Sequence, residues 1–138
     1  MISIKARNFE ESDLISCLIQ DSILHFSFHS YHPEKRCLRF MLNRFCWELK
    51  DSFEANQCYY RVHSGLYIHN VESIFISNNL EKVRFLNLLT FHAADQEINM
   101  IFSEKGYINL KISGLNIYLK DLHEKYPTAF CPLHTFAA

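Results

Sequence analysis

The sequence contains few of the residues that build flexible or phosphate-binding loops. Only 3 of its 138 residues are glycine and 3 are proline, which leaves little material for phosphate-cradling loops or long linkers. None of the motifs G-x-G-x-x-G, G-x-x-x-x-G-K-[ST], G-x-S-x-G and H-E-x-x-H occurs. The chain therefore shows no known signature of a nucleotide-binding loop, a serine hydrolase or a zinc protease, and we expect no cofactor.

An excess of charge of one sign is also missing. Lys and Arg number 14 against 15 Asp and Glu, which gives a formal net charge of -1. No global field would therefore draw the chain to nucleic acid or to an anionic membrane. Uninterrupted apolar runs are far shorter than the ~20 residues that span a bilayer. We expect neither a membrane nor nucleic acid as the main partner.

The cysteines lack the spacing of a disulfide or metal framework. Their number is odd, no C-x-x-C pair occurs, and acidic residues follow the N-terminus where a secretory signal would need an apolar run. These features favour a reducing cytoplasm and five unpaired thiols. The cysteines are Cys17, Cys37, Cys46, Cys58 and Cys131.

What the chain does contain is apolar and aromatic material. Hydrophobic residues make up 49% of the chain and aromatic residues 14%, against 21% charged residues, which excludes a disordered chain. The length fits one globular domain, residues 1–138. Enough apolar surface is present to bury a core without covalent staples.

The apolar pattern indicates mostly strands, with a helix after the first strand. Alternation over 2–6 predicts that strand, and Asn8 with Glu11 three residues later predicts the start of a helix near 9–20. Period-2 alternation then recurs through most of 24–112, which predicts antiparallel strands joined by short turns. In one of these turns, we expect Gly106 to take a positive φ.

The last periodic segment predicts a closing helix over 114–125. Four residues fall at helical spacing: Leu115, Tyr118, Leu119 and Leu122. We expect Leu119 and Leu122 to be buried. The expected fold class is therefore a β-dominated α+β domain. It is a bent antiparallel sheet or partly open barrel of about seven to eight strands, with one helix after the first strand and a C-terminal closing helix. This element order resembles pleckstrin-homology-like barrels, a likeness that carries no function.

A cluster of histidines suggests a metal site, but its spacing argues against one. His25, His29 and His32 form the densest histidine cluster, but His25 and His29 alternate with phenylalanines as on a strand. There, residues four apart are ~13 Å apart at ~3.3 Å per residue, too far to share a metal ion. We therefore expect no metal site, and solvated histidines instead. A cysteine beside a histidine would be a chance neighbour rather than a nucleophile.

Basic and aromatic residues also interleave around the stretch 35–47, a pattern typical of single-stranded nucleic-acid surfaces. The balanced net charge and nearby acidic residues argue for a solvated hairpin face instead. The residues concerned are Lys35, Arg36, Arg39 and Arg44 with Phe40, Phe45 and Trp47, close to Glu34 and Glu48.

A set of short motifs spread along the chain resembles a bacterial family. The motifs are Ile19-Gln20-Asp21-Ser22, Tyr31-His32-Pro33-Glu34-Lys35-Arg36, Leu42-Asn43-Arg44-Phe45-Cys46-Trp47-Glu48, Arg61-Val62-His63-Ser64-Gly65-Leu66 with Val71, Ile108-x-Leu110, Asp121-Leu122 and Pro132-x-His134. Together they resemble domain-of-unknown-function family 2948, found mainly in alphaproteobacteria. The chain departs from that pattern with Tyr126 in place of Trp and Ser22 in place of Ala. The resemblance implies a small cytoplasmic bacterial protein and supplies no catalytic residue.

The Asn43–Glu48 stretch is the candidate site. If it is a strand, Asn43, Phe45 and Trp47 share one face, and Arg44, Cys46 and Glu48 share the other. Two interpretations stay open. In the structural one, Trp47 closes an end of the barrel and Arg44 pairs with an acidic residue on an adjacent strand. In the functional one, a groove binds an anionic group or a backbone segment; its candidate residues are Asn43, Arg44, Trp47 and Glu48, with Asp21 and Tyr31.

The absence of recognisable catalytic groups leads to the functional expectation. We expect a non-catalytic binding or interaction module with an unknown protein partner or a second copy of itself, engaged through an exposed sheet edge or groove. The first alternative is an enzyme of unrecognised type acting on a small anionic ligand. The second is a weak binder of single-stranded nucleic acid.

Overall fold

The computed structural model describes residues 1–25, 29–50, 58–78, 80 and 85–132. Strands make up most of this part of the chain, and its single α-helix is α1 (Phe9–Ile19). The strands are β1 (Ser3–Ala6), β2 (Ile23–His25), β3 (His29–His32), β4 (Cys37–Phe45), β5 (Tyr59–Ile68), β6 (Val71–Ile76), β7 (Phe85–Ala94), β8 (Glu97–Phe102), β9 (Tyr107–Ile112), β10 (Ile117–Asp121) and β11 (Tyr126–Thr128). Short 3-10 turns include η2 (Trp47–Leu49) and η5 (Ser103–Lys105).

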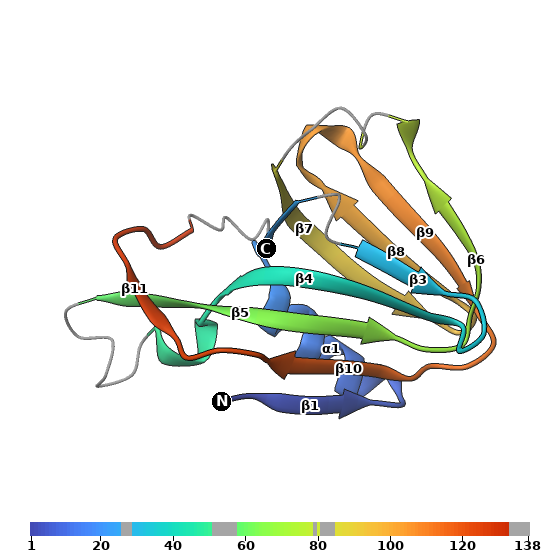
Figure 1. The fold of residues 1–138 in the computed structure, drawn as a ribbon, viewed down its shortest axis with the longest axis horizontal. Helices are drawn as coiled ribbons and strands as arrows, with labels where there is room; N and C mark the ends of the chain where they lie inside the picture. Colours follow the sequence, from blue (N-terminus) through green and yellow to red (C-terminus); the bar gives the residue numbers. More distant parts are fainter. Residues whose placement is uncertain (26–28, 51–57, 79, 81–84, 133–138) are drawn as a thin grey trace.

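The strands form one antiparallel sheet that bends but does not close. The order across it is β1-β10-β5-β4-β2-β7-β8-β9-β6, with β11 beside β5 and β3 beside β4. Figure 1 shows β1, β10, β5 and β4 side by side, with β7, β8, β9 and β6 fanning away from them. The predictions of a β-dominated chain, a bent antiparallel sheet and a helix after the first strand are confirmed.

Helix α1 begins and ends where the sequence indicates. The Asn8 side chain accepts a hydrogen bond from the Glu11 N–H at 2.9 Å, and Glu11 accepts one from the Arg7 N–H at 3.1 Å. These contacts satisfy backbone donors that an uncapped helix leaves unpaired. Ile15 and Ile19 are fully buried in the core. The helix lies behind β5 and β10 in Figure 1 and contacts β1, β4 and β7 on the core side of the sheet.

Alternation along β4, β5 and β10 gives the first half of the sheet two distinct faces. Every second side chain points to the core and is buried. On β4, Leu38, Phe40 and Leu42 are the apolar residues at these inward positions. The same alternation holds on β5 and β10, where Leu66 and Leu119 point to the core. The opposite face carries the residues between them and is not covered by α1, which lies on the core side.

The predicted closing helix over 114–125 is wrong, and with it the pleckstrin-homology-like order. This segment forms β10, which pairs with β1 on one edge and with β5 on the other. Ile117, Leu119 and Asp121 alternate inward, and a strand satisfies the backbone groups of both neighbouring strands as well as its own. Leu119 is fully buried as predicted, whereas Leu122, beyond the strand, is only half-buried.

The predicted count of seven to eight strands is too low, because two segments of the chain form more strands than the sequence indicates. The C-terminal segment supplies β10 and β11 in place of a helix, and the stretch predicted as one strand over 24–28 gives β2 and β3 on either side of residues 26–28. The polar stretch 49–58 predicts an exposed loop, but its residues 51–57 lie outside the described residues, as do residues 26–28.

Two local predictions are corrected as well. The predicted strand does not run through Trp47, because β4 ends at Phe45 and η2 follows it. Gly106 has a φ of -79°, and Glu104 and Lys105 take the positive φ values instead. A side chain at Gly106 would collide with the buried Leu80. The glycine is therefore needed for close packing rather than for backbone conformation.

None of the helices in the described ranges is long and apolar enough to cross a membrane. The five cysteines all lie within those ranges, and each is a free thiol.

Candidate functional site

Arg44 occupies the core side of the sheet near the end of β4. Its side chain is 0% exposed, and it is the largest fully buried side chain among the described residues. Inward placement follows from the alternation that also buries Leu42, two residues earlier. A buried guanidinium needs acceptors for every N–H and an opposite charge nearby.

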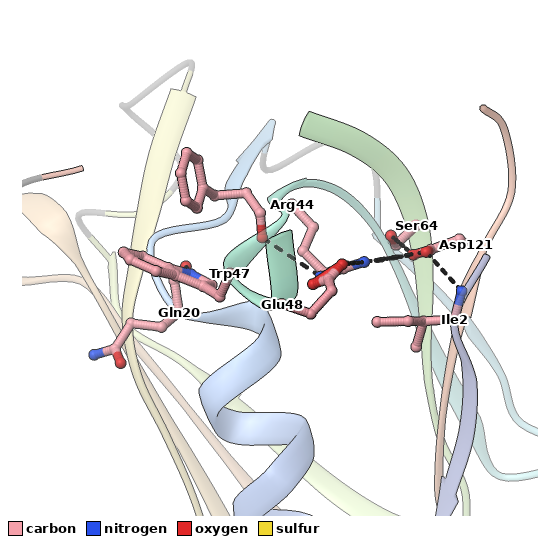
Figure 2. Close-up of polar contacts among 8 residues, drawn as sticks. Ile2, Gln20, Arg44, Trp47, Glu48, Ser64 and Asp121 are labelled. Atoms are coloured by element: carbon pink, nitrogen blue, oxygen red, sulfur yellow. Dashed lines mark hydrogen bonds and ion pairs between the residues drawn. The ribbon is translucent and has the colours of Figure 1, made fainter. Parts of the chain in front are cut away.

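Two carboxylates and one carbonyl supply these acceptors (Figure 2). Glu48 binds the guanidinium in a bidentate manner, with N–O distances of 2.8 and 2.9 Å. Asp121 accepts from Nε at 3.3 Å and from Nη2 at 3.0 and 3.2 Å. The Phe45 carbonyl accepts a further bond from Nη1 at 3.4 Å. All three nitrogens of Arg44 are engaged within the protein.

Asp121 is held from three sides. Besides Arg44, the Ser64 hydroxyl donates to it at 2.6 Å and the Ile2 N–H donates at 2.9 Å. Burial by itself raises the pKa of this carboxyl, but the hydrogen bonds from Ser64 and Ile2 and the contact with Arg44 outweigh it, so the pKa lies below its ordinary value. For Arg44, burial lowers the pKa, but the hydrogen bonds that it donates to Glu48 and Asp121 and the negative charges of these carboxylates more than offset this, so its pKa is raised. Both groups therefore stay charged at neutral pH.

A cleft of about 370 Å³ opens beside this cluster. Its lining includes Ile2, Cys46, Glu48, Asp121 and Lys125. Burial raises the pKa of the Cys46 thiol to about 11, so the thiol is protonated at neutral pH and is a poor nucleophile. Because Asp121 has a lowered pKa, it is a weak general base. This geometry gives Arg44 a structural role and leaves it no donor for a ligand.

Trp47 joins the end of β4 to the end of α1. Its indole N–H donates to the Gln20 carbonyl at 2.8 Å (Figure 2), and its ring meets Phe45 edge-on at 4.6 Å. Asp21 follows Gln20 in a left-handed conformation with a φ of 58°, and its N–H donates to the Leu88 carbonyl at 2.9 Å. Trp47 and Asp21 thus belong to the connection between the helix and the sheet.

Asn43 lies on the opposite face of the sheet from Arg44. Its amide donates to the Tyr126 hydroxyl at 2.6 Å, while its backbone carbonyl accepts from Arg61 at 3.0 Å. Tyr31 lies on β3, beside the first residues of β4, and its hydroxyl donates to the Val71 carbonyl at 2.8 Å. The six residues predicted from the sequence therefore do not form one surface: Arg44 and Glu48 contact each other, Asn43 faces away, and Tyr31 is remote.

The outer face of β1, β10, β5 and β4 carries a different cluster, which we call the tyrosine face. It consists of Lys5, Arg39, Tyr67, Tyr118 and Lys120. Strand pairing aligns four of them in one row across the sheet, because Lys5 pairs with Tyr118, Tyr118 with Tyr67, and Tyr67 with Arg39. Three steps of ~4.8 Å between strands make this row about 14 Å long.

The two tyrosine rings lie side by side along the sheet. Their centroids are 5.8 Å apart and their planes differ by 33°. A Cβ at Gly65 would come within 2.8 Å of the Tyr67 ring, so the ring lies over this glycine. On the far side, Lys5 Nζ lies 5.5 Å from the centroid of the Tyr118 ring. The absence of a side chain at Gly65 thus lets Tyr67 lie close to the backbone.

Cations border the rings, and among the described strand residues of this face none is a carboxylate. The outward positions of β1, β10, β5 and β4 contain no Asp or Glu, since the strand carboxylate Asp121 points inward. Lys5, Arg39 and Lys120 are exposed, and none of them takes part in the ion pairs of the described residues. Arg61 is half-buried and held by the Asn43 carbonyl, so it is not part of the tyrosine face.

The sequence contained a signal for this face that the helix prediction obscured. Tyr118 and Lys120 alternate with Ile117, Leu119 and Asp121, a period-2 pattern. If the segment were a helix, Tyr118 would lie in the core and Lys120 on the solvated surface. Assigned to a strand, both point outward.

The fold and these two clusters define a small, open antiparallel sheet with a buried ionic core and an exposed basic and aromatic face. The model of the family described as "Protein of unknown function (DUF2948)" matches residues 2–134, and the chain belongs to this family. No curated protein and no solved structure matches the chain.

Proposed function

We propose that the protein is a non-catalytic binding module that holds an anionic partner on the tyrosine face. The observation that supports this is the charge asymmetry of the sheet: three exposed cations and no carboxylate project from the outward positions of four adjacent strands. In a chain of net charge -1, such segregation creates a local positive field that the total charge hides.

The Arg44 cluster supports the non-catalytic part of the proposal. Its cleft contains a protonated thiol and two carboxylates that are already bound to Arg44. The pKa of Cys46 is raised and that of Asp121 is lowered, so neither is shifted toward neutrality, as a general acid or base would need. An anionic ligand finds an available cation on the outer face instead.

Retention on a heparin column tests the proposal. At pH 7 the net negative chain should be retained at low salt, and the double variant Arg39→Glu/Lys120→Glu should pass through unretained. Lys105→Glu, a single charge reversal in the β8–β9 turn, is the control outside this face, and it should still be retained at low salt. Passage of the unmodified protein, or equal loss in the control, would reject the tyrosine face as an anion-binding surface.

A further inference from the structure

We infer that the anionic partner is a single-stranded nucleic acid whose bases stack on Tyr67 and Tyr118 while its phosphates contact Lys5, Arg39 and Lys120. This inference rests on the proposed function and narrows it to one class of polyanion. The two tyrosines distinguish this class, because the cations alone would suit any polyanion.

The paired rings distinguish a nucleic acid from an acidic peptide. Carboxylate side chains would be recognised by the cations alone, whereas neighbouring aromatic rings on an open sheet offer stacking surfaces for consecutive bases. Tyr67 and Tyr118 are adjacent across two strands and both half-buried, so part of each ring remains accessible. Stacking on such rings tolerates every base, since each base has a π-face.

The cations border the rings on both sides. Lys5 and Arg39 stand at the two ends of the cross-strand row, outside the tyrosines. Lys120 lies two residues from Tyr118 on the same face and pairs with Gly65 in the next row. A chain of nucleotides crossing the strands would therefore meet a cation before the first ring and after the second.

A hollow beside Tyr67 gives the row room for one further planar group. It has a volume of about 240 Å³ and is lined by Ser30, Arg39, Phe40, Met41 and Tyr67. Small-molecule pockets usually begin near ~300 Å³ and enclose their ligand, so this open hollow suits part of a polymer better than a whole small molecule. Arg39 at its rim also contacts His32, which fixes the guanidinium at the edge of the face.

Fluorescence anisotropy with labelled oligothymidylate and oligouridylate tests the inference, with a duplex of the same length and polyglutamate as competitors. The single strands should bind more tightly than the duplex, although the duplex has the higher charge density. Three phosphate contacts predict a slope of log K against log salt of about -2 between about 50 and 200 mM salt.

Variants of the rings separate stacking from charge. Tyr67→Leu should weaken binding about tenfold, whereas Tyr67→Phe, which keeps the ring, should bind within twofold of the unmodified protein. Arg39→Gln should weaken binding of every sequence and make the salt slope shallower by about 0.7, with Lys105→Gln as the unchanged control. Thermal unfolding of each variant shows whether a loss of binding comes from misfolding. If Tyr67→Leu does not fold, Tyr118→Leu tests stacking in its place.

The outcomes distinguish the two proposals. Tighter binding of the duplex or of polyglutamate, with Tyr67→Leu unchanged, would overturn the single-strand inference and leave the anion-binding face intact. No binding of any polyanion near 50 mM salt would overturn both.

Discussion

The buried Arg44 cluster makes a graded prediction for stability. Arg44→Met removes the cation and leaves Asp121 as a buried carboxylate that is 5% exposed, with Ser64 and the Ile2 N–H as its remaining donors among the described residues. Leaving one member of a buried ion pair uncompensated costs about 3–5 kcal/mol. We therefore expect Arg44→Met to lower the free energy of unfolding by about 3–5 kcal/mol.

Substitutions of the partners of Arg44 should lower the free energy of unfolding by less than Arg44→Met does, with Glu48→Gln the mildest. Glu48→Gln removes a carboxylate that is 30% exposed while Arg44 keeps Asp121, so its cost should stay near or below about 1 kcal/mol. Asp121→Asn removes the buried anion but leaves Arg44 paired with Glu48, and should fall between these limits. Arg44→Met/Asp121→Leu replaces the buried pair with apolar groups and should recover most of the loss.

Urea unfolding at pH 7, followed by circular dichroism, measures all four variants against the unmodified protein. Asp121 also sets a pH dependence. Because its pKa is lowered in the folded state, its contribution is present above the unfolded pKa near ~3.9 and is lost as the pH falls through the folded pKa. Stability of the unmodified protein should therefore decline from about pH 5 downward, and less steeply in Asp121→Asn. A cost below about 1 kcal/mol for Arg44→Met, or one no larger than that of Glu48→Gln, would refute this account of the cluster.

Three further predictions concern packing and thiol reactivity. Gly106→Ala should cost about 1–3 kcal/mol in urea unfolding, because its Cβ would overlap the buried Leu80; an unchanged midpoint would show that the site can relax. Leu119→Ala should cost about 2–5 kcal/mol by the same assay, since Leu119 is fully buried on β10, and a cost under about 0.5 kcal/mol would contradict its core position. With iodoacetamide near neutral pH, peptide mapping should find exposed Cys17 modified first and Cys46 only on unfolding; early modification of Cys46 would contradict its burial and raised pKa.

Local pattern was enough to predict the parts of the fold that local contacts stabilise. The Asn8 cap and an apolar stripe predict α1, the stripe being Leu14, Ile15, Leu18 and Ile19. The structure confirms the cap and buries the stripe except for Leu14, which is 51% exposed. Short alternating runs likewise predict most strands. The closing helix failed because Leu115, Leu119 and Leu122 fit the helical period by chance, while the partners that stabilise a strand there are β1 and β5, remote in sequence.

The candidate site shows the same limit. The sequence singled out the Asn43–Glu48 stretch, and the i to i+4 contact of Arg44 with Glu48 lies within reach of such reasoning. Asp121 is 77 residues from Arg44, and the structural interpretation expected an adjacent strand. In the structure, β5 lies between β4 and β10, and the long arginine side chain reaches across it. Only the strand order could reveal this partner.

The buried cluster and the tyrosine face depend on each other through the register of β10. A shift of one residue in a strand exchanges its two faces, so a slipped β10 would expose Asp121 and bury Lys120. Arg44 stabilises Asp121 on the core side and thereby favours the register that presents Tyr118 and Lys120 outward. In Arg44→Met the buried carboxylate instead opposes that register, so native-state hydrogen exchange should quicken at the amides of β10 and β1 more than at those of β8. Equal exchange in all three strands would mean that the ion pair stabilises the protein only globally, and that the apolar residues Ile117 and Leu119 suffice to orient β10.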